Sequence, residues 1–101
     1  MKYLKRCYAE IRLDLLKNNL DYIRSLLPDK APVMAVVKAD AYGHGDILCA
    51  KKLESLGVSD FGVSNIEEAM ALRKAGVKGE ILIFGPTPFE YAENLIAYRL
   101  T

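Results

Sequence analysis

The fold is decided by residues 33–45, which read Val33-Met34-Ala35-Val36-Val37-Lys38-Ala39-Asp40-Ala41-Tyr42-Gly43-His44-Gly45. The first five residues are an uninterrupted apolar run. Such runs are typical of strands that are buried on both faces, as in a parallel sheet. The two glycines further along allow positive φ angles and a close approach of the backbone to a ligand. The segment therefore predicts a buried strand that leads into a tight polar loop.

The same order of strand, turn and amphipathic helix recurs along the chain. Apolar residues at helical spacing predict four helices, and short apolar runs predict strands between them. The helices are expected at residues 15–27, 46–56, 66–73 and 88–98, and the core strands at 33–38, 60–63 and 81–84. Alternation of apolar and polar residues over Cys7–Leu13 predicts a further, leading strand with one polar face. The same rhythm predicts another strand after Arg99.

Short polar residues and glycines mark the expected helix ends. We expect Asp14 to cap the first helix and Ser64 or Asn65 to cap the third. Ser64 and Glu67 have the spacing of a capping box. Gly57 is expected to end the second helix as a C-terminal cap.

Strands and helices that alternate with short connections predict an α/β fold with parallel strands and right-handed crossovers. A doubly wound sheet and part of a barrel both fit this order. The first strand is not followed by G-x-G-x-x-G, and no G-x-x-x-x-G-K-[ST] occurs, which disfavours a nucleotide-binding version. A complete eight-stranded barrel needs roughly 250 residues. Three core strands would leave a barrel unclosed, so we expect the 101 residues to begin something larger.

The composition is that of an ordinary globular protein, with 51% hydrophobic and 27% charged residues. A formal charge of +1 gives no sign of nucleic acid or an anionic membrane as a partner. No apolar run is long enough to span a bilayer. Cys7 and Cys49 form no paired motif and are expected to be reduced thiols. The single histidine cannot build a metal site. These features favour a soluble, cytoplasmic protein without a metal.

Lys38 and Tyr42 are the residues to which chemistry can be assigned. A lysine amine at the end of a buried strand can form a Schiff base with an aldehyde, and strand ends face the active site in an α/β barrel. The Tyr42 phenol and loop N–H groups could hold a phosphate. Lys38 also fits a solvated strand end, and Tyr42 also fits a packed aromatic with an exposed hydroxyl. The neighbouring Asp40 and His44 fit simple loop formers. Spacing alone leaves both interpretations open.

Residues 35–45 closely resemble the pyridoxal phosphate attachment signature of alanine racemases. The flanking segments resemble that family in the same order along the chain. They are residues 9–13 with Asn19-Leu20, Phe61-Gly62-Val63, Glu67-Glu68-Ala69, residues 72–76 and residues 81–85. The resemblance therefore covers essentially the whole chain.

This resemblance implies the N-terminal portion of a (β/α)8 TIM-type barrel, the fold type III of pyridoxal phosphate enzymes. Residues 14–101 would be the first part of the barrel domain, with about three of its strands. Residues 1–13 would provide a leading strand that joins a C-terminal β domain outside these residues.

The resemblance also implies the site. Lys38 would bind pyridoxal 5'-phosphate covalently and act as one of two catalytic bases. Tyr42 would donate a hydrogen bond to the cofactor phosphate. Val36, Leu82 and Phe84 would pack near the pyridine ring. The family more often has an aliphatic residue where Phe84 stands, so this wall of the site differs in shape.

The implied activity is the interconversion of L-alanine and D-alanine, which supplies D-alanine for peptidoglycan, by a cytoplasmic homodimer. The second base would be a tyrosine of the partner subunit's C-terminal domain, which these residues do not include. We therefore expect the isolated 101 residues to be inactive. One alternative is an enzyme of the same cofactor class, either a serine racemase or another barrel-type enzyme such as a decarboxylase; residues 42–45 argue against the decarboxylase. The other alternative is a non-catalytic piece, either a truncated product or a half-barrel that associates with other chains through its exposed sheet edge.

Overall fold

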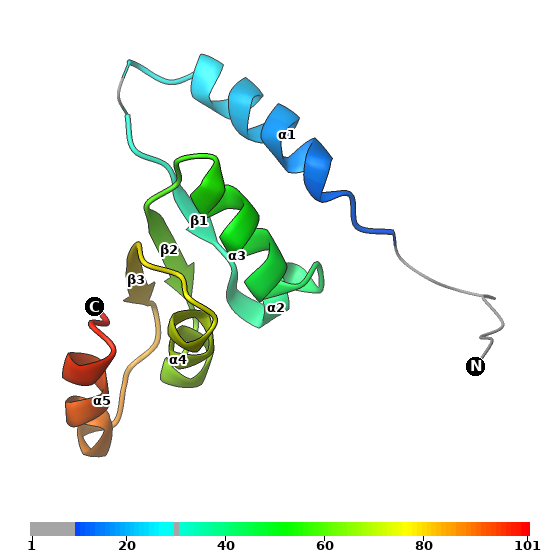
Figure 1. Cartoon of the computed structure of the whole chain (residues 1–101). Coiled ribbons are helices and arrows are strands. Elements are labelled where there is room, and N and C mark those ends of the chain that lie inside the picture. Colours follow the sequence, from blue (N-terminus) through cyan, green and yellow to red (C-terminus); the bar gives the residue numbers. More distant parts are fainter. Residues whose placement is uncertain (1–9, 30) are drawn as a thin grey trace, which may run out of the picture.

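The computed structural model describes residues 10–29 and 31–101 (Figure 1). Helices and strands alternate along these residues. The elements are α1 (Leu13–Ser25), β1 (Met34–Val36), α2 (Lys38–Tyr42), α3 (Asp46–Ser55), β2 (Asp60–Val63), α4 (Ile66–Lys74), β3 (Glu80–Ile83), a 3-10 helix (Phe89–Tyr91) and α5 (Ala92–Ala97). None of the helices in these ranges is both long and apolar enough to cross a membrane.

The three strands form one parallel sheet in the order β1-β2-β3. Val36 lies beside Gly62, and Gly62 lies beside Leu82, so these three residues occupy one level of the sheet. Since consecutive strands are neighbours and each pair is joined through helical segments, the units are βαβ crossovers of the kind expected. The prediction of an α/β fold with three parallel strands is confirmed.

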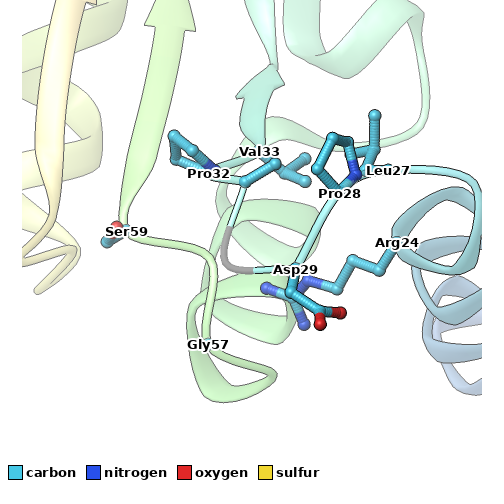
Figure 2. Close-up of a pocket in the computed structure, with 9 residues that line it drawn as sticks. Arg24, Leu27, Pro28, Asp29, Pro32, Val33, Gly57 and Ser59 are labelled. Carbon is cyan, nitrogen blue, oxygen red and sulfur yellow. The ribbon is translucent and has the colours of Figure 1, made fainter.

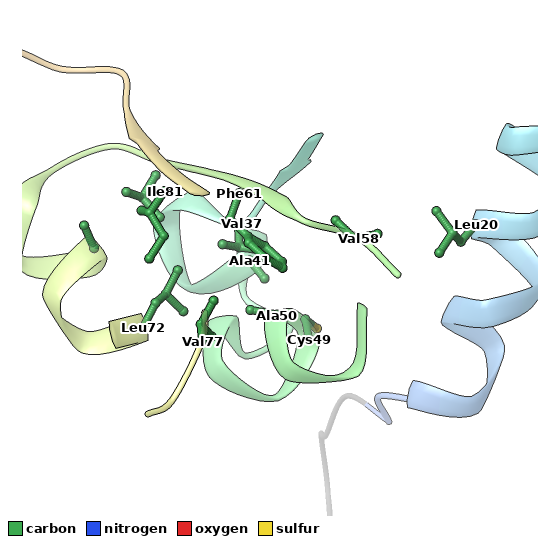
Figure 3. Packing of buried hydrophobic residues seen from close by; sticks show 12 residues of the cluster. Leu20, Val37, Ala41, Cys49, Ala50, Val58, Phe61, Leu72, Val77 and Ile81 are labelled. Atoms are coloured by element: carbon green, nitrogen blue, oxygen red, sulfur yellow. The ribbon is translucent and has the colours of Figure 1, made fainter. Parts of the chain in front are cut away.

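Helices α3 and α4 cover one face of the sheet, and the hydrophobic core lies between these helices and the sheet (Figure 3). Phe61, Val63 and Ile81 point into this core and are completely buried. Ala50 of α3 and Leu72 of α4 meet them from the helices, also without exposure. Burying a side chain of this size stabilises a fold by about 1.5–3 kcal/mol. This layer therefore supplies most of the apolar stabilisation of the described residues.

The opposite face of the sheet carries no helix among the described residues. Met34 and Val36 of β1 are 42% and 37% exposed, and Phe84, just after β3, is 52% exposed. The prediction that the first core strand is buried on both faces is therefore wrong for this structure. The strand is also shorter than predicted, because Val37 leaves the extended conformation with a ψ of 22°.

Residues 7–9 of the leading strand predicted over Cys7–Leu13 lie outside the described residues, which begin at Glu10. Glu10, Ile11 and Arg12 have no regular secondary structure, and Leu13 is already the first residue of α1. Leu20 is the residue of α1 that is buried, because it joins the cluster over α3. The strand assignment therefore fails at Leu13, whose side chain packs with α1 against that cluster.

The structure contradicts one of the predicted helix caps, Asp14 of α1, and confirms another, Asn65 of α4. Arg12 precedes α1, and its guanidinium donates hydrogen bonds to Asp14, which lies inside the first turn. These hydrogen bonds lower the pKa of the Asp14 carboxyl. At α4 the cap is Asn65, whose side chain accepts a hydrogen bond from the Glu68 N–H at 2.9 Å. Asn65 was one of the two predicted caps, whereas the capping pair is Asn65 with Glu68 and not Ser64 with Glu67.

The last part of the chain differs from the predicted single helix over residues 88–98. A 3-10 turn comes first, and α5 follows it as a separate short helix. A regular strand does not form at residues 99–101, where the sequence predicts one, but Thr101 pairs with β3 through two hydrogen bonds. Thr101 donates to the Ile81 carbonyl and accepts from the Ile83 N–H, each at 2.9 Å. Thr101 therefore lies beside β3 in a parallel arrangement.

Candidate active site

Lys38 follows the carboxyl end of β1 and is the first residue of α2. Its side chain is half-buried. Within residues 10–29 and 31–101, the Lys38 ammonium forms no hydrogen bond or ion pair. The amine is therefore free to react with a ligand at the end of the sheet where parallel strands place active sites.

Helix α2 is a turn of left-handed helix. The φ angles of Ala39, Asp40, Ala41 and Tyr42 lie between 52° and 56°, whereas right-handed helices have negative φ. For L-amino acids this hand costs about 1–2 kcal/mol for each residue, because Cβ approaches the following carbonyl oxygen. A run of this kind persists only where the surrounding structure holds it, and such strain is concentrated at functional sites.

Local hydrogen bonds tie the turn to the residues before and after it. The Ala41 N–H donates to the Val37 carbonyl at 2.9 Å, and the Gly45 N–H donates to the Asp40 carbonyl at 2.8 Å. The Asp40 carboxylate also accepts from the Asp46 N–H at 2.9 Å, which ties the turn to the start of α3. Asp40 is therefore a loop former, as one of the two interpretations of the sequence proposed.

Tyr42 and His44 lie where the turn opens towards solvent. The Tyr42 side chain is 63% exposed, which leaves its hydroxyl accessible to a ligand. The His44 ring nitrogen Nδ1 lies 2.9 Å from the Ala41 carbonyl oxygen. Gly43 and Gly45 have φ angles of 91° and 93°, which only glycine adopts readily. The sequence-based expectation that these two glycines take positive φ is confirmed.

The three residues expected to face the cofactor ring share the uncovered face of the sheet. Val36 and Leu82 are on the same level, and Phe84 follows Leu82 by two residues, so alternation places all three on one side. Gly62 lies between them and was not predicted. A Cβ added to Gly62 would lie 2.5 Å from the end of the Phe84 ring and 3.4 Å from the Met34 sulfur. A glycine inside a strand is the sequence signal for such a close approach.

Acidic groups surround the buried thiol behind the turn. Burial raises the pKa of Cys49, and the charges of Asp40 and Asp46 raise it further. Burial also raises the pKa of Asp46, with a smaller contribution from Asp40. A thiol of this kind is a poor nucleophile, so Cys49 is a packing residue. Across the residues that the structure describes, no three His, Cys, Asp or Glu side chains are grouped to hold a metal ion.

Two cavities lie beside this region and at the other end of the sheet. A cavity of about 510 Å³ between α1, β1 and α3 reaches Val36 and His44, but Lys38, Tyr42, Leu82 and Phe84 do not line it. A second cavity, of about 420 Å³, lies at the amino end of the strands (Figure 2). It is lined by residues that include Arg24, Asp29, Pro32 and Ser59. The candidate site is therefore the open end and face of the sheet and not an enclosed pocket.

Comparison with known proteins assigns the family. The sequence model of the alanine racemase N-terminal domain matches residues 11–101. The chain belongs to the alanine racemase family. The resemblance seen in residues 35–45 and in the flanking segments is thereby confirmed.

Individual alanine racemases match most or all of the chain. Alanine racemase 2 of Bacillus subtilis is 39% identical over 101 residues, which are 100% of this chain and 26% of that protein. An alanine racemase of Clostridium perfringens is 48% identical over 89 residues, or 88% of this chain and 23% of the relative. The chain thus spans about a quarter of the length of these relatives.

Solved structures give the same result for the fold. The alanine racemase of Clostridium difficile 630 in complex with cycloserine superposes with a TM-score of 0.89 at 39% identity. That match covers 98% of this chain and 26% of the racemase chain. The described residues therefore have the fold of the N-terminal barrel portion of alanine racemases, as expected.

Proposed function

We propose that this chain is the amino-terminal part of a pyridoxal 5'-phosphate-dependent alanine racemase and that Lys38 binds the cofactor. The observation that carries the proposal is the position of Lys38. Its amine is unpaired among the described residues and stands at the carboxyl end of β1, next to the strained turn. Membership of the alanine racemase family supports the assignment of the activity.

The residues present fit such a cofactor. A lysine amine can bind the aldehyde carbon covalently, and the apolar face formed by Val36, Leu82 and Phe84 can pack against a planar ring. The exposed Tyr42 hydroxyl can donate a hydrogen bond to a phosphate oxygen. When bound, pyridoxal phosphate withdraws electrons from the substrate and makes the proton on Cα acidic.

In this proposal, Lys38 would move the Cα proton on one face of the substrate, because an amine that holds the cofactor aldehyde would be close to the carbon that reacts there. The left-handed turn fixes the backbone on the carboxyl side of Lys38, which limits the positions that the amine can take. Racemisation needs a second base on the opposite face. We propose that this base lies outside the 101 residues, in the partner subunit of a homodimer, so that the isolated chain is inactive.

The wider parts of the proposal follow from the family. In this proposal, residues 14–101 form the first part of the barrel domain, and residues 1–13 join the C-terminal β domain of the full enzyme, which lies outside these residues. The substrates are L-alanine and D-alanine, and the product supplies peptidoglycan synthesis in the cytoplasm. A broader amino acid racemase is the second candidate. It is favoured by a protein of Enterococcus faecalis described as an amino-acid racemase, which is 42% identical over 96 residues.

The first experiment tests cofactor binding by the 101-residue chain. The chain is incubated with pyridoxal phosphate, its visible absorption is recorded, the adduct is reduced with borohydride, and the labelled lysine is located by mass spectrometry. We expect label on Lys38 and its loss in Lys38→Arg, which retains the positive charge. Lys74→Arg, on the surface of α4, is the matched control and should label Lys38 normally. Label scattered over surface lysines would contradict the proposal.

The second experiment tests the need for a partner base and the choice of substrate. Purified chain is incubated with pyridoxal phosphate and with L-alanine or L-serine, and the D-enantiomer is measured. We expect no racemisation of either amino acid. Alanine racemisation that disappears in Lys38→Arg would show that these residues suffice and would refute the placement of the second base elsewhere.

A further inference from the structure

The first backbone N–H after Lys38 is held by a side chain from the next strand–helix unit. The Glu68 carboxylate accepts a hydrogen bond from the Ala39 N–H at 2.7 Å through Oε2. Its other oxygen, Oε1, accepts from the Ser64 N–H at 2.8 Å. Ala39 follows β1 and Ser64 follows β2, so one carboxylate joins the carboxyl ends of two neighbouring strands.

The local structure explains why this N–H needs an external acceptor. Ala39 is the first residue of the left-handed turn, and the first N–H groups of any helical turn lack partners within the turn. A carboxylate is the strongest acceptor available in a protein, and hydrogen bonds to it are short. Glu68 is itself fixed, because it lies in the first turn of α4 and its N–H donates to the Asn65 cap.

The bond acts directly on Lys38. The Ala39 N–H belongs to the peptide unit whose carbonyl is that of Lys38, so holding this N–H fixes the plane of the peptide that follows the lysine. We propose that Glu68 is a positioning residue for Lys38, which holds the strained turn so that the lysine amine stays at the open face of the sheet. This inference rests on the proposed role of Lys38 in binding the cofactor.

Glu68→Gln is the variant that tests the bond, and Glu67→Gln is its matched control. A glutamine side chain has one uncharged acceptor oxygen, so it cannot hold both N–H groups as the two carboxylate oxygens do, and its hydrogen bond to either of them is weaker. Glu67 lies in the same first turn of α4 and is exposed. Both variants therefore remove one negative charge from the same helix end, but only Glu68→Gln disturbs the two hydrogen bonds.

Amide hydrogen exchange in the full 101-residue chain measures the bond without any cofactor. We expect exchange at the Ala39 and Ser64 amides to become about tenfold to a hundredfold faster in Glu68→Gln. The Val37 amide, which donates to the Gly62 carbonyl, serves as the internal reference for general loosening of the fold. Equal acceleration at Val37 and Ala39, or the same change in Glu67→Gln, would overturn the proposal.

Pyridoxal phosphate labelling then tests whether the bond positions the lysine. We expect Glu68→Gln to reduce the rate of Lys38 labelling about tenfold relative to the surface lysines, with Glu67→Gln unchanged. Faster Ala39 exchange with unchanged Lys38 labelling would make Glu68 a structural residue only and would overturn the positioning role. If the unmodified chain does not label Lys38, the proposed function fails, and the positioning role fails with it even where exchange shows the hydrogen bond.

Discussion

The two faces of the sheet are built from alternate residues of the same strands, yet they differ completely in their surroundings. Phe61, Val63 and Ile81 on one face are fully buried beneath α3 and α4. Val36 and Phe84 on the other face remain 37% and 52% exposed. Both faces are apolar, so composition does not separate them. The covered face therefore stabilises the fold, while the open face is available for a ligand or for further chain.

The largest expected effect is on the covered face. Phe61→Ala removes a fully buried ring and leaves a cavity between the sheet and the helices, so we expect a loss of about 3–5 kcal/mol in the free energy of unfolding. Denaturant unfolding of the chain measures this loss. Val36→Ala, on the same sheet but on the open face, should cost below about 1 kcal/mol, because little area returns to water. Equal losses would refute the division between the two faces.

The second effect concerns the reactivity of a thiol on the covered side. Since burial and two nearby carboxylates raise the pKa of Cys49 above its ordinary value of 9.0, the thiolate fraction at pH 8 is reduced. We expect iodoacetamide to alkylate Cys49 at least about tenfold more slowly than a free cysteine, as followed by mass spectrometry of its peptide.

The same shift predicts a direction for stability. The folded chain binds the thiol proton more tightly than the unfolded chain does, so this contribution is present below about pH 9 and is lost as the pH rises further. In the alkylation experiment described above, unfolding the chain with denaturant should restore the rate of a free cysteine. Fast alkylation of the folded chain would show that the covered side opens readily.

The smallest effect tests the contact between Gly62 and Phe84 on the open face. In Gly62→Ala the new methyl group would meet the end of the Phe84 ring at 2.5 Å, and the exposed ring can swing outwards. We expect a cost below about 1 kcal/mol. Combining it with Phe84→Ala should remove that cost, as a double-mutant cycle measures. An unchanged cost in the double variant would show that the ring is not what limits this position.

Much of the fold could be predicted from local patterns. The strand at 60–63 lies where the apolar run and its flanking turn residues placed it, and the helices at 46–56 and 66–73 were found within a few residues. These elements follow from hydrophobic periodicity and from glycines such as Gly57, whose φ is 95°. Local preference and tertiary packing agree in these elements.

The candidate site was less predictable, because long-range contacts decide it. Ala39, Asp40 and Ala41 adopt a left-handed conformation that none of them prefers, and part of its support comes from Glu68, which is 29 positions away from Ala39. The apolar run of β1 shows that its residues suit burial, but which face is covered depends on other segments. The cap of α4 illustrates the same limit. Ser64 with Glu67 and Asn65 with Glu68 both have the spacing of a capping pair, and only the position at which the helix begins selects Asn65.

The left-handed turn has a consequence for chirality in this chain. Its backbone is the mirror image of the ordinary helical turn, so it is the conformation that D-amino acids favour and L-amino acids resist. In a chemically synthesised chain, D-alanine at positions 39 and 41 would adopt the observed φ angles of 52° and 55° without the steric conflict that L-alanine meets. The segment that begins at Lys38 is therefore a place where an inverted stereocentre would relieve strain instead of creating it.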